Sequence, residues 1–308
     1  MNVLNIATLS LRRAFFALCM IIFSASLVQA SEKVSIKSGD LTLNANLTLA
    51  EGKQLSDGVV VLTHGTLAHY EMEIIKTLQS LLNERGHNTL AINLSLGVDN
   101  RGPAMYDCKI PHKHRSVDAV DEISSWITWL KSRGAAKISV LGHSRGGNQT
   151  ARYAAGQPDA AVEHVILVAP ATWTRKKSEG GYEKRFKTSL QPLLAKAEKL
   201  VAEGKGDSLM EKIGILYCPD TSATASAFVS YNKPDPARHT PNLLKDIKLP
   251  TLVIAGANDK IVTGLPEAVK PYVDGKKITL KVIEDADHFF QDFAAEEVAD
   301  LIDEFIKN

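Results

Sequence analysis

One serine of the chain stands in a setting that is typical of a catalytic nucleophile. Residues 142–147 (GHSRGG) place Ser144 close to glycines, where a predicted strand ends and a predicted helix begins. A nucleophile elbow needs this arrangement, because the serine occupies a sharp turn that projects its Oγ. The alternative is a glycine-rich turn shaped only for packing. The segment lacks the Gly-Lys-Ser/Thr ending of a phosphate-binding loop.

A serine hydroxyl needs a base to take its proton and a carboxylate to orient that base. Among nine histidines, His288 follows the last predicted strand, and Asp259 follows the strand before it. Loops after parallel strands meet at one edge of a sheet, so we expect Ser144, Asp259 and His288 to converge there. The neighbouring carboxylates Asp285 and Asp287 are rivals, which we expect to cap the last helix or face solvent.

Acyl transfer also requires backbone donors for the oxyanion that forms. The segment His64-Gly65-Thr66-Leu67 follows a short apolar strand predicted over residues 59–62. We expect the N–H of Thr66, or in second place that of Leu67, to act with the N–H of Arg145. A simple strand-end turn is the other interpretation. We expect His64 itself to be structural.

Strands alternate with helices over most of the chain. Residues 41–49 alternate apolar and polar side chains, as in a half-buried antiparallel strand. The remaining predicted strands cover residues 34–36, 59–62, 89–94, 138–141, 164–169, 252–255 and 278–283, and helices cover 71–85, 117–130, 146–155 and 293–306. This pattern predicts an α/β fold with a mostly parallel central sheet flanked by helices. Residues 171–247 interrupt it, and we expect a helical insertion there.

Together these motifs resemble the α/β-hydrolase fold superfamily over essentially the whole chain after residue 30. The His-Gly turn, the elbow, the Gly-x-x-Asp loop and the terminal Asp-His follow one another in the matching order. The resemblance implies that Ser144 is the nucleophile, Asp259 the acid and His288 the base, and that the amides of Thr66 and Arg145 form the oxyanion hole.

The resemblance also implies a domain organisation. Residues 31–308 would form one hydrolase domain, with the insertion at about 171–247 as a lid over the site. Haloalkane dehalogenases and epoxide hydrolases resemble this layout but use a carboxylate nucleophile. The serine at position 144 argues against both.

The first thirty residues have the pattern of a secretory signal peptide. Arg12 and Arg13 precede an apolar run over residues 14–28, and a small residue, Ala30, stands where a signal peptidase would cleave. A retained membrane anchor is the alternative, but the run is shorter than the ~20 residues that span a bilayer. Leu18 before Cys19 argues against a lipoprotein. We therefore expect an exported protein, periplasmic or secreted, with no stable membrane span after cleavage.

The composition excludes several classes of protein. A net charge of +1 is not the basic excess of a nucleic-acid binder, and 44% hydrophobic residues argue against a disordered chain. Three cysteines are too few for a disulfide scaffold. After cleavage Cys108 and Cys218 remain, and they form either a disulfide or two separate thiols.

Three weaker features allow two interpretations each. Cys108, His112 and His114 have a zinc-like spacing, but no fourth ligand is apparent and neighbouring lysines would repel a cation. We expect a polar loop and no metal. Trp173 lines an acyl pocket or packs in the core. A basic stretch attracts anionic lipid or an acidic substrate, or forms a solvated surface, which we favour; it comprises Arg175, Lys176, Lys177, Lys184, Arg185 and Lys187.

The favoured hypothesis is an exported serine hydrolase, carboxylesterase-like, that cleaves a carboxylic ester or thioester through an acyl-enzyme on Ser144. It would need no cofactor, act on a small acyl substrate and bind no nucleic acid. An amidase, peptidase or acyltransferase with the same triad is the first alternative. A non-catalytic binding protein on this fold is the second, and it would be expected to lack a triad member. The oligomeric state is left open.

Overall fold

The fold is described from a computed structural model that covers residues 31–308. The predicted signal peptide lies outside these residues. Within them, eight strands form the central sheet in the order β1-β2-β4-β3-β5-β6-β9-β10. They are β1 (Ser31–Ser38), β2 (Leu41–Thr48), β3 (Val59–Thr63), β4 (Asn88–Asn93), β5 (Ile138–His143), β6 (Val162–Val168), β9 (Thr251–Gly256) and β10 (Ile278–Ile283).

The sheet is parallel except at one edge. β1 pairs antiparallel with β2, and β2 pairs antiparallel with β4, whereas all the remaining neighbours are parallel. Every residue of β3, β4, β5 and β9 is buried, as expected of parallel strands that helices cover on both faces. The predicted α/β class with a mostly parallel sheet is confirmed.

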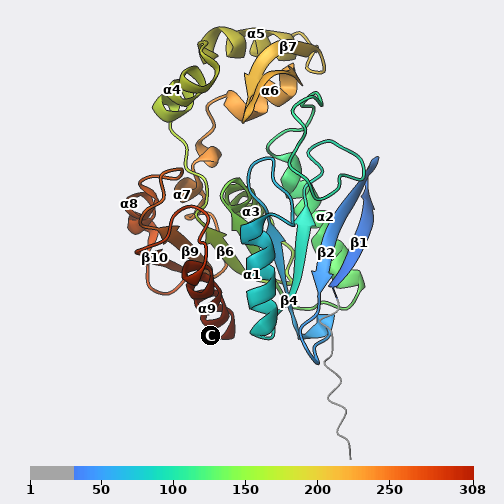
Figure 1. Ribbon diagram of the computed structural model, residues 1–308, viewed down its shortest axis with the longest axis vertical. Coiled ribbons are helices and arrows are strands. Elements are labelled where there is room, and N and C mark those ends of the chain that lie inside the picture. The colour runs from blue at the N-terminus through green and yellow to red at the C-terminus, as the bar shows by residue number, and fades with distance from the viewer. Residues whose placement is uncertain (1–30) are drawn as a thin grey trace, which may run out of the picture.

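Helices cover both faces of the sheet (Figure 1). Apolar side chains of α1 (Glu73–Glu84) and α9 (Phe293–Lys307) share one core with the strands. Those of α2 (Asp118–Ser132), α3 (Arg145–Ala155) and α8 (Leu265–Val269) belong to a second core. The sheet therefore lies between two layers of helices, and its strand ends are left for the loops.

Residues 175–232 of the insertion fold around a small core of their own and lie at the top of Figure 1, beyond the strand ends, whereas Leu243 near its end packs in one of the cores of the sheet. The sequence predicted a helical insertion, but the structure has a β-hairpin between the helices of the insertion. Small and polar residues such as Thr221 and Ser222 hide the strand pattern, and pairing with the neighbouring strand decides it. Its elements are α4 (Arg175–Phe186), α5 (Leu190–Ala202), β7 (Leu209–Ile215), β8 (Cys218–Thr224), α6 (Ala225–Asn232), η2 (Pro236–Arg238) and α7 (Thr240–Leu243).

The loop between β4 and α2 is joined to this hairpin. Cys108 and Cys218 form a disulfide with their Cα atoms 5.3 Å apart. Beside it, the His112 N–H donates to Ser222 O at 2.8 Å, and the Thr224 N–H donates to His112 O at 2.9 Å. Of the two pairing states that the sequence left open, the structure has the disulfide.

The sequence predicted a polar loop here, but the insertion covers the two histidines of this loop and buries them. His112 and His114 are 0% and 3% exposed. His112 Nδ1 lies 3.1 Å from His114 Nε2, and His114 Nδ1 lies 2.7 Å from the hydroxyl of Tyr231 on α6. Burial lowers the pKa of His112 to about 4 and that of His114 to about 3, so both rings are neutral near pH 7.

Residues 31–308 contain neither a helix that could cross a membrane nor a cluster that could hold a metal ion. No helix in this range is both long and apolar enough to cross a membrane. No three side chains of His, Cys, Asp or Glu in the same range are grouped so that they could hold a metal ion.

Candidate active site

Ser144 stands at a strained turn between β5 and α3. Its φ of 56° and ψ of −120° lie in a region that residues with a side chain rarely adopt. The turn is held from β6, because the Ser144 N–H donates to Val168 O at 2.9 Å and Ser144 O accepts from the Ala171 N–H at 2.8 Å. A Cβ at Gly142 would collide with the backbone of Gly146. The glycines therefore allow the close strand–helix approach that projects the Ser144 side chain.

The structure brings Ser144, His288 and Asp259 together in one hydrogen-bonded chain. His288 Nε2 lies 2.9 Å from Ser144 Oγ, and His288 Nδ1 lies 2.7 Å from Asp259 Oδ2. His288 is 4% exposed and Asp259 9%. Such a chain lets the histidine accept the serine proton while the carboxylate fixes its orientation.

The environment of Asp259 keeps this carboxylate ionised. Burial by itself would raise its pKa, but hydrogen bonds outweigh burial and hold the pKa below the ordinary value of an aspartate. One bond joins it to His288. The backbone N–H groups of Ile261 and Val262 donate to its other oxygen, Oδ1, at 2.7 and 2.8 Å.

The rival carboxylates lie elsewhere in the loop that carries His288. Asp285 is exposed, and Asp287 accepts a hydrogen bond at 2.8 Å from the N–H of Phe289. Neither is hydrogen-bonded to His288 in the described part of the chain.

The two predicted oxyanion residues lie side by side. Arg145 Nε donates to Thr66 Oγ1 at 3.0 Å, which ties the loop after β3 to the start of α3. The Arg145 N–H is the first of α3, where helical N–H groups have no partner within the helix. A Cβ on Gly65 would come within 3.3 Å of Ser144 Cβ, so this loop passes close to the serine.

His64 supports this loop from beneath. It is fully buried, and its Nε2 accepts from the Leu94 N–H at 3.1 Å. Burial, and then the charge of Arg101, lowers its pKa to about 3. A neutral, buried ring with these partners matches the structural role expected of His64.

His143 is a site residue that the sequence reasoning missed. Its buried ring places Nε2 2.9 Å from the backbone oxygen of His288 and packs 4.8 Å from the His288 ring. Burial, followed by the charge of His288, lowers its pKa to about 4. His143 therefore holds the loop of His288 against the elbow. Its place directly before Ser144 was the signal that could have found it.

Ser144 and His288 open into a cavity of about 520 Å³. Its apolar walls come from Met72, Met105, Tyr217, Ile261 and Phe289. Two cationic side chains, Arg185 and Lys260, also line it. Tyr217 and Arg185 belong to the insertion, so that segment forms part of the cavity wall.

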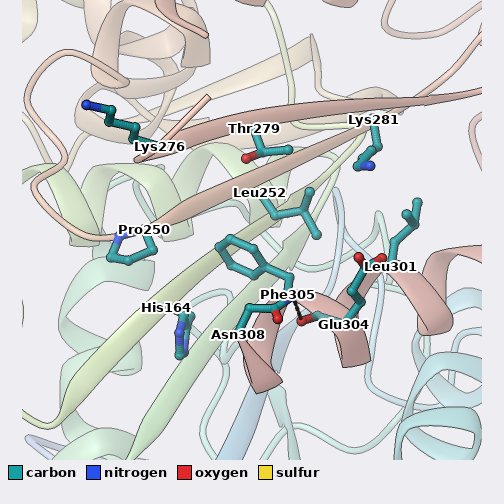
Figure 2. Close-up of a pocket in the computed structure, with 10 residues that line it drawn as sticks. All are labelled: His164, Pro250, Leu252, Lys276, Thr279, Lys281, Leu301, Glu304, Phe305 and Asn308. Carbon is teal, nitrogen blue, oxygen red and sulfur yellow. Dashed lines mark hydrogen bonds between the residues drawn. The ribbon is translucent and has the colours of Figure 1, made fainter. Parts of the chain in front are cut away.

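A second hollow, of about 420 Å³, lies near the starts of β6, β9 and β10 (Figure 2). His164, Thr279 and Glu304 are among its polar side chains. None of the predicted site residues lines it, so the predicted chemistry belongs to the opposite strand ends.

A mostly parallel sheet, covered by helices on both faces, carries a serine elbow and a Ser-His-Asp chain at its strand ends. This combination defines an α/β hydrolase. The chain belongs to the serine aminopeptidase S33 family, whose family model matches residues 54–291. No curated protein sequence matches it significantly.

Solved structures share this fold at low sequence identity. Est1E from Butyrivibrio proteoclasticus is 18% identical with a TM-score of 0.63, over 90% of this chain and 99% of that chain. The Pyrococcus furiosus esterase Pf2001 is 19% identical with a TM-score of 0.58, over 91% and 92%. A dienelactone hydrolase from Anabaena variabilis is 19% identical with a TM-score of 0.54, over 91% and 97%.

Proposed function

We propose that the protein is an exported serine hydrolase that cleaves a carboxylic ester or thioester through an acyl-enzyme on Ser144. The observation that carries this function is the chain from Ser144 Oγ through His288 to Asp259, which opens into a cavity with apolar walls. The esterases among the structural neighbours support it as an analogy of fold.

The distances in the site support the proposed acylation step. Ser144 Oγ attacks the carbonyl carbon while His288 Nε2, 2.9 Å away, takes its proton. Asp259 stabilises the imidazolium through Nδ1–H. The tetrahedral oxyanion is stabilised by the N–H groups of Thr66 and Arg145, each worth about 3–4 kcal/mol in the transition state.

Collapse of the tetrahedral intermediate breaks the bond to the alcohol or thiol, which leaves with the proton from His288. A water molecule then loses a proton to His288 Nε2 and attacks the acyl-enzyme. The second intermediate releases the acid and returns the proton to Ser144 Oγ. The cycle needs no electron donor and no cofactor.

Export and a covering role for the insertion belong to the same proposal. The segment over residues 1–30 has the composition of a signal peptide. The disulfide of Cys108 and Cys218 suits an oxidising compartment. Tyr217 and Arg185 of the insertion line the cavity, as expected of a lid.

Aminopeptidase activity is the second candidate, because the matching family model carries that description. An aminopeptidase must neutralise the free ammonium group of its substrate. No Asp or Glu is among the residues that line the cavity in the described chain, and Arg185 and Lys260 are cationic. The charges of the cavity therefore favour esters over N-terminal peptides.

The nucleophile is tested by labelling with a fluorophosphonate. We expect the wild-type protein to be labelled at Ser144, and Ser144→Ala to lose the label. Ser139→Ala is the matched control and should be labelled like the wild type, because Ser139 lies within β5, away from the cavity. A folded wild-type protein that resists the probe would contradict the proposed function.

The two candidate substrates are compared with one chromophore pair. We expect p-nitrophenyl butanoate to be hydrolysed, with a kcat/KM at least about 100-fold above that of an aminoacyl p-nitroanilide, because the ester is the more reactive acyl donor and the ammonium lacks a carboxylate partner. A faster reaction with the anilide would favour the aminopeptidase instead.

A further inference from the structure

A second pocket at the active-site end of the sheet, of about 260 Å³, adjoins the active-site cavity and is separate from the hollow in Figure 2. Arg185 and Ile261 line both, so the two spaces share a wall. Trp173, Tyr182 and Tyr231 supply aromatic walls to the second pocket. Trp173 therefore lines this pocket and is not among the residues that line the active-site cavity.

Four cationic side chains converge on this pocket from distant parts of the chain. They are Arg145 from α3, Lys177 and Arg185 from α4, and Arg238 from η2. No Asp or Glu is among the described residues that line the pocket. None of the four cations has a carboxylate within 4.0 Å in residues 31–308.

Arg238 shows that this positive charge is poorly compensated. Its guanidinium lies over the Trp173 ring, 5.3 Å from the centroid, and donates to Lys233 O at 3.2 Å. The nearby carboxylate, Asp235, is instead paired with Arg152. Burial, and then the charges of Arg145 and Arg152, lowers the pKa of Arg238 to about 9. Such a group gains stability from an anion placed beside it.

Arg145 brings the same charge close to the reacting serine. It follows Ser144 directly, its Nε is used on Thr66 Oγ1, and its guanidinium lies 5.4 Å from the Tyr231 ring centroid. No hydrogen bond from its two terminal nitrogens is found in the described residues. The indole N–H of Trp173 is likewise buried without a partner there. The pocket therefore offers several N–H donors that have no acceptor.

On the basis of the hydrolase function proposed above, we propose that this pocket binds the acidic group of the substrate. Its ligand is a compact oxyanion, a carboxylate or a phosphate, on either the acyl or the leaving-group side of the ester. Arginine forks match both anions in geometry and charge. The wall shared with the active-site cavity lets one molecule place its carbonyl at Ser144 and its acid beside Arg145 and Arg238.

Paired esters test this specificity. Three charged esters place a carboxylate on the acyl side (p-nitrophenyl hydrogen adipate), a carboxylate on the leaving group (4-carboxyphenyl butanoate), or a phosphonate on the acyl side (p-nitrophenyl 4-phosphonobutanoate). Each is compared with its methyl-blocked neutral form. We expect wild-type kcat/KM to favour at least one charged ester by about tenfold or more, as loss of a charged hydrogen bond would cost.

Arg238→Gln should remove most of that preference, chiefly through KM. Lys176→Gln removes one charge from the same region, but Lys176 does not line the pocket, so its ratio should stay that of the wild type. If Arg238→Gln fails to fold, as judged by its melting temperature, the exposed Arg185→Gln replaces it. Three charged esters no better than their neutral forms, or a preference that both variants keep, would overturn the proposal.

A binding measurement separates this pocket from catalysis. Monomethyl adipate should bind Ser144→Ala by isothermal titration calorimetry at least about tenfold more tightly than dimethyl adipate, and added salt should weaken it. If the wild type is labelled by the fluorophosphonate but Ser144→Ala does not prefer monomethyl adipate, the hydrolase proposal stands and the anion pocket is refuted. If Ser144→Ala prefers monomethyl adipate but the wild type is not labelled, the hydrolase proposal is refuted and the anion pocket stands.

Discussion

Two serine–histidine pairs lie at opposite ends of β5, because Ser139 is near its start and Ser144 directly follows its end. At the end of the strand, Ser144 Oγ lies 2.9 Å from His288, whose other nitrogen meets Asp259. Near its start, Ser139 Oγ lies 3.4 Å from His164 Nδ1, and no carboxylate bonds to His164 in the described residues. His164 lines the hollow in Figure 2.

The difference shows what turns such a pair into a candidate active site. Ser144 occupies a strained turn, whereas Ser139 has the ordinary extended backbone of a strand. The cavity lined by Ser144 and His288 has a volume of about 520 Å³, and the hollow lined by His164 has a similar volume of about 420 Å³. Backbone strain and a third side chain, Asp259, separate the two ends, and cavity size does not.

Removing the carboxylate should make the first pair resemble the second. We expect Asp259→Asn to lower kcat by about 10⁴-fold, because the amide favours the wrong tautomer of His288. Activity is measured with p-nitrophenyl butanoate at pH 7.5. Asp285→Asn is the matched control from the loop of His288 and should change kcat less than twofold. Equal losses in the two variants would assign the orienting role to neither carboxylate alone.

The disulfide is the next largest expected contribution at the active-site end. Replacing both Cys108 and Cys218 by Ser should lower the free energy of unfolding by up to about 4–5 kcal/mol, because the bridge closes a loop over a sequence separation of 110. Urea unfolding of the oxidised wild type and the double variant measures the difference. Ser132→Ala, on the exposed side of α2, is a control that should stay within about 0.5 kcal/mol. An unchanged midpoint would show that the bridge adds no stability.

The active-site end should also make the protein sensitive to acid. Four buried histidines have pKa values of about 3 to 4: His64, His112, His114 and His143. Below pH 6.5 these histidines are protonated in the unfolded chain but stay neutral in the folded chain. The free energy of unfolding therefore decreases as the pH is lowered, by up to about 1.4 kcal/mol per pH unit for each ring.

One carboxylate opposes this trend. Burial raises the pKa of Glu122 to about 7, so the folded state holds its proton between pH 7 and 4.5. The net loss between pH 6.5 and 5 should be on the order of 2–4 kcal/mol per pH unit. Glu122→Gln should steepen it, because glutamine binds no proton. Urea unfolding at pH 7.5, 6.5 and 5.5 gives the slope, and a stability that is flat with pH would contradict it.

The sequence by itself determined the fold class and the positions that meet at the strand ends. The period-two and helical patterns are local signals, and a parallel sheet brings the loops that follow its strands to one edge. Ser144, Asp259 and His288 could be chosen because each follows a strand. The catalytic roles of these three residues are part of the proposed function.

Only the tertiary structure decided the rest. The hairpin over residues 209–224 forms through pairing that its small and polar side chains do not announce. The Cys108–Cys218 bridge, the burial of His114 under Tyr231 and the meeting of Arg145 with Arg238 each join segments far apart in sequence. Such contacts depend on how the insertion packs against the sheet, and no local residue pattern encodes that packing.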